Sequence, residues 1–264
     1  MTKASFQAIK PGLRVLISAA ASGIGKSIAE AFQENDCKVH ICDSDQRAID
    51  ECLASNPMIS ATFADVSDPD MVDRVFEDVT SKLGGLDVLV NNAGIAGPIA
   101  PVQDIDPMDW NRTIAVNLNS HFYCARKAVP LLQNSGGGCI IFIASSAAFF
   151  GCPLRSPYSV SKWGLIGLTK TLAMELGPSG IRVNAICPGS VEGERINSVM
   201  QRDARSQNKS IEEIRKNYLA QNSMGTFVEA RDVANMTLFL ASSMGAKISG
   251  QAIGLDGNTE SFSL

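Results

Sequence analysis

The chain has 264 residues, of which 45% are hydrophobic and 19% are charged, and its formal net charge is −4. This composition excludes a disordered or collagen-like protein, and the acidic balance without a long basic run argues against binding to nucleic acid or to an anionic membrane surface. The length suits one large α/β domain.

Short apolar runs alternate with amphipathic stretches along the chain. Runs typical of strands lie at residues 14–18, 38–42, 59–64, 87–91, 139–144, 181–186 and 252–255. Stretches with helical spacing lie at residues 23–34, 45–54, 68–83, 107–133, 157–176 and 230–241. Because strands that alternate with helices form right-handed crossovers, the pattern predicts one α/β domain over 1–264. We expect a doubly wound parallel sheet of about seven strands, with helices on both faces and ligands at the carboxyl ends of the strands.

The first predicted strand leads directly into a glycine-rich turn and a helix. Gly23 and Gly25 let the backbone approach a pyrophosphate, and the helix N-terminus offers free N–H groups. We therefore expect the cofactor contacts of this turn to come from Ser18, Ser22, Gly23, Ile24 and Gly25. A tight turn without a ligand is the structural alternative.

The same segment has a second functional interpretation. Residues 20–27 read A-x-x-x-x-G-K-S, a relaxed P-loop in which Lys26 and Ser27 would bind a triphosphate and Mg²⁺. The leading glycine of that motif is replaced by Ala20. A P-loop nucleotide hydrolase or kinase is the alternative from another class.

Asp43 ends the second predicted strand, 18 residues after Gly25. A carboxylate at this point accepts hydrogen bonds from the ribose hydroxyls of NAD and repels the 2′-phosphate of NADP. No basic residue stands at Ser22 or Ser44 to neutralise that phosphate. The pattern predicts NAD as cofactor, with a helix-capping aspartate as the alternative.

Tyr158 and Lys162 are four residues apart in a helical stretch, and Ser145 follows the fifth predicted strand. Residues i and i+4 share a helix face, so the ammonium group lies beside the phenol. A neighbouring cation lowers the pKa of tyrosine from its ordinary value near 10, which makes Tyr158 a usable general acid/base. Ser145 would hydrogen-bond the substrate oxygen.

Residues 192–227 interrupt the alternation with a long polar segment. Such an excursion inside a compact domain is typical of a substrate-binding lid. Arg195 opens it, and Arg155 stands three residues before Tyr158. Either guanidinium group would suit an acidic substrate, and the alternative is a pair of solvated arginines.

With these motifs in order, the chain resembles the short-chain dehydrogenase/reductase family over nearly its whole length. Asp65-Val66 matches the adenine-contact pair of the family, Asn91-Asn92-Ala93-Gly94 matches the motif after the fourth strand, and Pro188-Gly189 matches the motif after the sixth. Asn117, in Val116-Asn117-Leu118, matches the active-site asparagine.

The resemblance implies a Rossmann-like fold and an NAD(P)-dependent alcohol dehydrogenase or ketone reductase that uses no metal. It implies that Tyr158 is the acid/base, that Lys162 also binds the nicotinamide ribose, that Ser145 orients the substrate and that Asn117 supports a proton-relay water. The further cofactor residues that it implies are Asp65, Val66, Asn92, Ala93, Gly94, Pro188, Gly189 and Val191. Family members are commonly homotetramers, with the fifth and sixth helices and the C-terminal strand at the interfaces.

Two departures from the family pattern bear on the cofactor. Ala19 replaces the first glycine of the turn, which puts the turn conformation in question. Gly193 replaces the threonine that contacts the nicotinamide carboxamide, so Ser190, the Val191 backbone or the lid must take its place.

The seven cysteines have no C-x-x-C spacing, which is typical of free thiols in a reducing compartment. No apolar run is long enough to span a bilayer, so we expect a cytoplasmic protein. The sequence thus predicts an NAD-dependent oxidoreductase acting on a secondary alcohol or ketone. A 3-oxoacyl thioester reductase and a non-catalytic NAD-binding protein are the alternatives.

Overall fold

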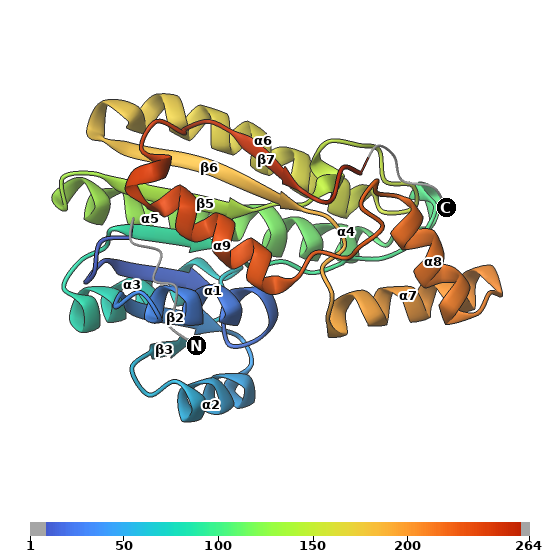
Figure 1. The fold of residues 1–264 in the computed structure, drawn as a ribbon, viewed down its shortest axis with the longest axis horizontal. Coiled ribbons are helices and arrows are strands. Elements are labelled where there is room, and N and C mark those ends of the chain that lie inside the picture. The colour runs from blue at the N-terminus through green and yellow to red at the C-terminus, as the bar shows by residue number, and fades with distance from the viewer. Residues whose placement is uncertain (1–8, 260–264) are drawn as a thin grey trace.

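The computed structural model describes residues 9–259. Seven parallel strands form one sheet in the order β3-β2-β1-β4-β5-β6-β7, with helices on both sides (Figure 1). The strands are β1 (Arg14–Ser18), β2 (Lys38–Asp43), β3 (Ser60–Phe63), β4 (Val88–Asn91), β5 (Gly138–Ile143), β6 (Ile181–Pro188) and β7 (Ala252–Leu255). This confirms the predicted fold class.

The helices divide between the two faces of the sheet. Those of the described chain are α1 (Gly23–Gln33), α2 (Gln46–Ser55), α3 (Pro69–Leu83), α4 (Pro107–Ile114), α5 (Ser120–Asn134), α6 (Ser156–Leu176), α7 (Glu194–Gln207), α8 (Ile211–Ala220) and α9 (Ala230–Ala241). Helices α1, α2 and α9 share one hydrophobic core, and α3, α5 and α6 share the other.

Each central strand supplies both cores by the alternation of its side chains. In β1, Val15 and Ile17 belong to the core under α1, whereas Leu16 belongs to the core under α3. All three side chains are fully buried. A strand buried on both faces must be apolar at every position, which explains the nearly continuous apolar runs of the sequence.

The stretch 107–133, predicted as a single helix, is divided in the structure. Helix α4 ends at Ile114, a π-helical turn spans Ala115–Asn119, and α5 follows. A π-turn adds one residue to a helical turn and shifts the faces of the residues beyond it. Here it holds Asn117 fully buried.

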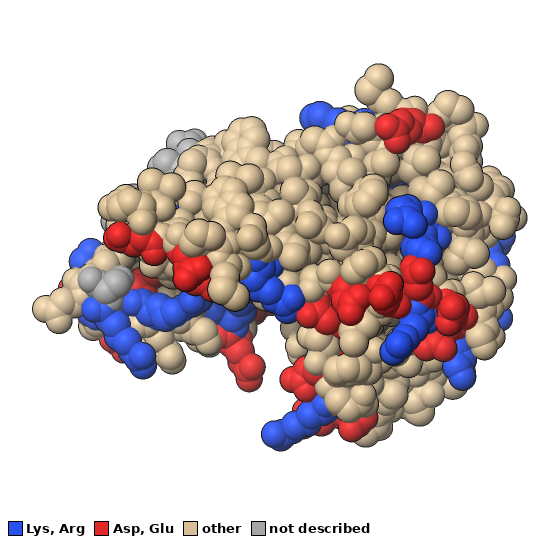
Figure 2. All heavy atoms as spheres, turned by 180° about the vertical axis from the view of Figure 1, so that it is seen from behind, with Lys and Arg blue, Asp and Glu red and all other residues tan. Residues whose placement is uncertain are grey.

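The strand order reverses between β1 and β4, and in sheets of this kind the ligand lies at the carboxyl ends of the strands beside that point. A cavity of about 1700 Å³ opens there, lined by the glycine-rich turn, the ends of β4–β6 and the helices α7 and α8. Seen from behind, the surface is hollowed at this cleft, and both basic and acidic side chains lie around it (Figure 2).

Helices α7 and α8 project past the ends of the strands, apart from the two main layers (Figure 1). They pack on each other through Met200, Ala204 and Ile214, a small hydrophobic cluster of their own. Helix α8 begins at a capping box of Ser210 and Glu213. Within residues 9–259, no helix has the length and apolar character needed to cross a membrane.

Candidate active site

Tyr158, Lys162 and Ser145 come together at the base of the cleft. Tyr158 and Lys162 lie one turn apart on α6, and Lys162 Nζ is 5.8 Å from the centre of the Tyr158 ring. The buried ammonium group also donates to the carbonyl oxygen of Ile143, 3.0 Å away at the end of β5. Ser145 follows that strand, its Oγ accepts from the N–H of Ala147 at 3.2 Å, and it lines the same cavity as Tyr158 and Lys162.

The surroundings of Tyr158 act on its acidity in opposite directions. Burial raises the pKa of Tyr158, but the positive charges of Lys162, Arg195 and Arg155 and the hydrogen bond from Ser145 together lower it below its ordinary value. Burial lowers the pKa of Lys162, against the opposing influence of Tyr158. The lowered pKa makes the phenol a better group for proton exchange than an isolated tyrosine.

Asn117 holds the loop that follows β4. Its Oδ1 accepts a hydrogen bond from the N–H of Ile95 at 2.7 Å, and its Nδ2 donates to the carbonyl of the same residue at 2.9 Å. The amide also donates to Ser161 Oγ on α6, one residue before Lys162. The side chain therefore links the π-turn, the loop and the helix that carries Tyr158.

The segment Asn92-Ala93-Gly94 is fastened to β1. Ser18 Oγ accepts from the backbone N–H groups of Asn92 and Ala93, at 3.0 and 3.3 Å. A side chain at Gly94 would place its Cβ 3.4 Å from Asn117 Oδ1 and 3.5 Å from Lys162 Nζ. Glycine thus keeps this backbone close to both groups.

The glycine-rich turn leaves the start of α1 open. Ser22 stands at the N-cap without capping the helix by its side chain, whereas Asp45, Asp68 and Asp106 cap α2, α3 and α4. A Cβ at Gly25 would lie 2.4 Å from the carbonyl oxygen of Ala19, so the turn and the helix meet without room for a side chain. Free N–H groups at a helix start suit a phosphate group.

The two acidic positions lie at the other end of the cleft. Asp43 accepts from the N–H of Ala21 at 3.0 Å, which ties the end of β2 to the glycine-rich turn. Asp65 pairs with Arg112 of α4 at 2.9 Å and also accepts hydrogen bonds from Ser67. Burial raises the pKa of Asp65, but Ser67 and Arg112 outweigh it and hold that pKa below its usual range. Val66 is buried beside them.

Pro188 ends β6, and the backbone then turns across the mouth of the cleft. A Cβ at Gly189 would lie 2.9 Å from the Asp256 Cβ, and Val191 forms a bridge with Val228. Gly193 precedes α7 with a φ of 144°, in the backbone region that favours glycine. Ile24, Pro188, Gly189 and Val191 all line the cavity.

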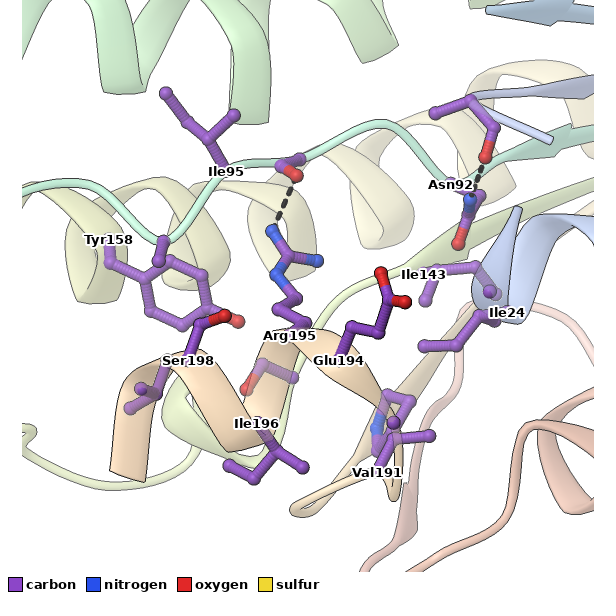
Figure 3. Close-up of a pocket in the computed structure, with 18 of the residues that line it drawn as sticks. Ile24, Asn92, Ile95, Ile143, Tyr158, Val191, Glu194, Arg195, Ile196 and Ser198 are labelled. Atoms are coloured by element: carbon purple, nitrogen blue, oxygen red, sulfur yellow. Dashed lines mark hydrogen bonds between the residues drawn. The ribbon is translucent and has the colours of Figure 1, made fainter. Parts of the chain in front are cut away.

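Both candidate arginines lie beside Tyr158. The Arg155 guanidinium carbon is 4.4 Å from the centre of the Tyr158 ring. Arg195, from the first turn of α7, donates to the carbonyl oxygen of Gly94 (Figure 3). The structure thus brings together the predicted residues of the catalytic end, and it places Asp43 and Asp65 at the opposite end.

Two residues of this region escaped the sequence analysis. Arg112 has the sequence context of an ordinary surface arginine, and only the fold reveals its contact with Asp65. His121 donates from Nε2 to the carbonyl oxygen of Ala93 at 2.9 Å. Its spacing of four residues from Asn117 was a usable indication that both face the same loop.

Comparisons with known proteins agree with this geometry. A family model described as enoyl-(acyl carrier protein) reductase matches residues 19–258. The chain is 34% identical over 246 residues to a 3-oxoacyl-(acyl-carrier-protein) reductase of Thermotoga maritima, covering 92% of this chain and 95% of that protein. It is 32% identical over 250 residues to a D-beta-hydroxybutyrate dehydrogenase of Rhizobium meliloti, covering 92% and 96%. A crystal structure of an actinorhodin polyketide ketoreductase variant with NADPH superposes with a TM-score of 0.90 at 29% identity, covering 93% of this chain and 96% of that one.

Proposed function

The chain belongs to the short-chain dehydrogenase/reductase family, and we propose that it is an NAD-dependent enzyme with Tyr158 as its general acid/base. Enzymes of this family oxidise or reduce CH–OH groups with a nicotinamide cofactor. The observation that carries the proposal is the contact set at Tyr158. The buried ammonium group of Lys162 lies 5.8 Å from the centre of the phenol ring, and Ser145 lines the same cavity as both residues.

The residues present fit a dinucleotide. The uncapped start of α1 offers N–H groups to a pyrophosphate, and Gly25 holds its backbone where a side chain would collide with the turn. We propose that the cofactor contacts of this chain are Ser18, Ser22, Gly23, Ile24, Gly25, Asp43, Asp65, Val66, Asn92, Ala93, Gly94, Tyr158, Lys162, Pro188, Gly189 and Val191.

The chain's own residues would accept and release the proton, while the bound nicotinamide would supply the chemistry of hydride transfer. In the oxidation direction, Tyr158 takes the proton of the substrate hydroxyl as the carbon loses its hydride and becomes a carbonyl carbon. Ser145 donates to the same oxygen and holds it beside the phenol. Lys162 keeps the phenolate accessible, and Asn117 supports the water path by which the proton leaves.

Tyr158→Phe tests this assignment. The variant keeps the ring but loses the hydroxyl, so turnover falls at least ~10²-fold while cofactor binding persists. NADH formation on a panel of hydroxy acids, polyols and sugars measures turnover, and fluorescence titration measures cofactor binding. Tyr123→Phe, on α5, is the matched control and keeps full activity. Near-normal turnover by Tyr158→Phe would show that Tyr158 is not the acid/base. If the unaltered protein binds the cofactor but turns over no substrate, the chain is a non-catalytic NAD-binding protein.

A 3-oxoacyl thioester reductase is the second candidate. The similarity to a 3-oxoacyl-(acyl-carrier-protein) reductase supports it, but Asp43 favours NAD, whereas those enzymes usually use NADPH. Reduction of acetoacetyl-coenzyme A, measured with NADH and with NADPH, separates the two candidates. The sheet order and the family assignment leave the P-loop alternative without support.

We further propose a cytoplasmic homotetramer that carries residues 192–227 as its substrate lid. Large apolar side chains are exposed on α5 and α6, among them Phe122 (47%), Trp163 (51%) and Met174 (82%). Exposed apolar surface of this kind is typical of an interface. The seven cysteines are free, as in a reducing compartment. Sedimentation velocity gives the number of chains, and a monomer at micromolar concentration would contradict this assembly.

A further inference from the structure

Arg155 occupies an unusual environment for a cation. Its guanidinium group lies against the Tyr158 ring, and Nη2 donates to the carbonyl oxygen of Ala96 at 3.2 Å. Its Nε is buried and has no hydrogen-bond partner. A guanidinium group carries five N–H donors, so the two N–H groups of Nη1 and the second one of Nη2 remain for a ligand in the cavity that Arg155 lines.

Arg195 adds a second cation on the lid side of the same tyrosine. It donates to the carbonyl oxygen of Gly94, two residues before Ala96, and lies between Tyr158 and Glu194 in Figure 3. Among residues 9–259, neither arginine lies within ion-pair distance of a carboxylate. The hydrogen-bond partner of each guanidinium group is thus a neutral carbonyl oxygen of the loop after β4.

Five other arginines of the described chain have either a carboxylate or two carbonyl oxygens as partners. Arg14, Arg112, Arg215 and Arg231 each pair with a carboxylate at 2.7 to 2.9 Å. Arg182, which has no carboxylate, donates to two carbonyl oxygens. A partly buried cation without a counter-ion is unfavourable. Unlike Arg182, Arg155 has a single carbonyl acceptor and a buried Nε without a partner, so an anion that arrives with the ligand would supply the contacts it lacks.

The nearby acidic groups do not supply that anion. Glu192 is held by Arg215 in a bidentate pair at 3.2 and 2.7 Å. Asp203 accepts from the Tyr218 hydroxyl at 2.6 Å. The Glu194 side chain lies on the side of Arg195 that faces Ile24, away from Tyr158 (Figure 3).

We propose that Arg155 forms an anion subsite and that the substrate is a small hydroxy acid or the corresponding keto acid, with Arg195 as a second cation on the lid. This assignment rests on the proposed function, because it places the acid group of the substrate next to the carbon that reacts at Tyr158. The shared ligand chemistry is a carboxylate or a sulfonate, which a guanidinium group binds through two parallel hydrogen bonds.

Calorimetry with compounds that cannot be turned over tests the subsite directly. The probes are malonate, sulfoacetate and the uncharged malonamide, none of which contains an alcohol or ketone. The unaltered protein binds at least one of the acids more tightly than malonamide. Arg155→Met weakens that binding at least ~30-fold and leaves malonamide unchanged, because a buried charge-assisted contact is lost. The more tightly bound acid identifies the class of acid group.

Arg202→Met, on the exposed side of α7, is the matched control and stays within twofold of the unaltered protein. Arg155→Gln keeps a donor for Ala96 without the charge and shows the same loss as Arg155→Met, so it carries the test where the methionine variant fails to fold. Equal binding of acids and malonamide by the unaltered protein overturns the proposal. Because calorimetry measures binding and not turnover, it tests the anion subsite even if the proposed dehydrogenase activity is absent.

Turnover distinguishes a subsite from an indirect action through Tyr158. With 3-hydroxybutyrate and butan-2-ol as an acidic and a neutral alcohol, Arg155→Met raises KM for the acid alone, whereas any effect that follows from the pKa of Tyr158 changes kcat equally on both alcohols. Equal losses of kcat on both alcohols with an unchanged KM for the acid would mean that Arg155 acts only through the tyrosine.

Discussion

Tyr158 shows how much of the site chemistry depends on a few opposed influences. Burial alone raises the pKa of this phenol and makes it a poorer proton acceptor. Lys162 on α6, Arg155 at the N-cap of that helix and Arg195 on α7 reverse that effect. The acidity of the tyrosine therefore depends on α7 as well as on α6, since one of the three cations, Arg195, lies on α7.

Cofactor choice is expected to depend on Asp43. Asp43→Asn keeps an acceptor for the N–H of Ala21 but removes the charge that repels a 2′-phosphate. The ratio of NAD to NADP affinity should therefore fall at least ~10-fold, with the fold intact. Fluorescence titration with both cofactors measures it, and Asp50→Ala, on the exposed face of α2, is the control. An unchanged ratio would remove Asp43 from cofactor selection.

Ala19 carries a backbone cost that a glycine would not. Its φ of 50° lies in the left-handed region, where a Cβ costs roughly 1–2 kcal/mol. Glycine loses about 0.5–1 kcal/mol more chain entropy on folding, so Ala19→Gly should raise the free energy of unfolding by up to about 1 kcal/mol. Urea unfolding measures the change.

The neighbouring Ala21→Gly is the control for that experiment. Ala21 is buried and its φ is not positive, so the same change should lower the free energy of unfolding by about 0.5–1 kcal/mol. Two losses of similar size would show that the left-handed conformation of Ala19 carries no strain.

Residue-scale prediction from the sequence succeeded where spacing determines proximity. Tyr158 and Lys162 are one helical turn apart in any helix, so their contact follows from the sequence alone. The contact between Arg112 and Asp65 joins residues 47 positions apart, and no local pattern announces it. Likewise, the sequence placed Arg155 near Tyr158 but could not show that the guanidinium group lies against the ring.

At the scale of elements, the π-turn at Ala115–Asn119 is the main departure from prediction. Local propensity favours one continuous helix over 107–133, because apolar spacing alone does not reveal an inserted residue. The turn is held by tertiary contacts of Asn117 with Ile95 and Ser161. Such contacts form only once the loop after β4 and α6 are in place.

The α7–α8 pair should open more readily than the sheet. Arg215 links α8 to Glu192, two residues before the start of α7, and lies 4.5 Å from the centre of the Phe227 ring. Arg215→Met should speed amide hydrogen exchange in α7 and α8 while leaving the melting temperature unchanged, because the pair is exposed.

Arg47→Met is the matched control for Arg215→Met, since Arg47 also forms an exposed ion pair, with Glu51 on α2. It should leave exchange in α7 and α8 unaltered. Faster amide exchange throughout the sheet in Arg215→Met would show that the α7–α8 pair and the core unfold together.

For the whole molecule, the sequence was most informative about the sheet. Its strands are buried on both faces, so their apolar runs stand out from the amphipathic helices between them. Residues 192–227 stand out in the sequence only as a polar interruption, because α7 and α8 bury a small cluster on each other rather than a face on the sheet.

Two buried histidines should make the whole fold sensitive to acid. His40 lies between Ser60 and Thr62, where burial lowers its pKa to about 4, and burial lowers the pKa of His121 to about 3. Both remain neutral in the folded chain at pH 5, whereas in the unfolded chain they bind protons below about 6.5. The free energy of unfolding should therefore fall as the pH falls from 6.5 towards 4, by about 2–3 kcal/mol per histidine over two pH units. Urea unfolding at pH 7 and pH 5 measures this slope. His40→Asn should make it shallower, because an amide does not titrate, and an identical slope in that variant would show that His40 takes up its proton without opposing the fold.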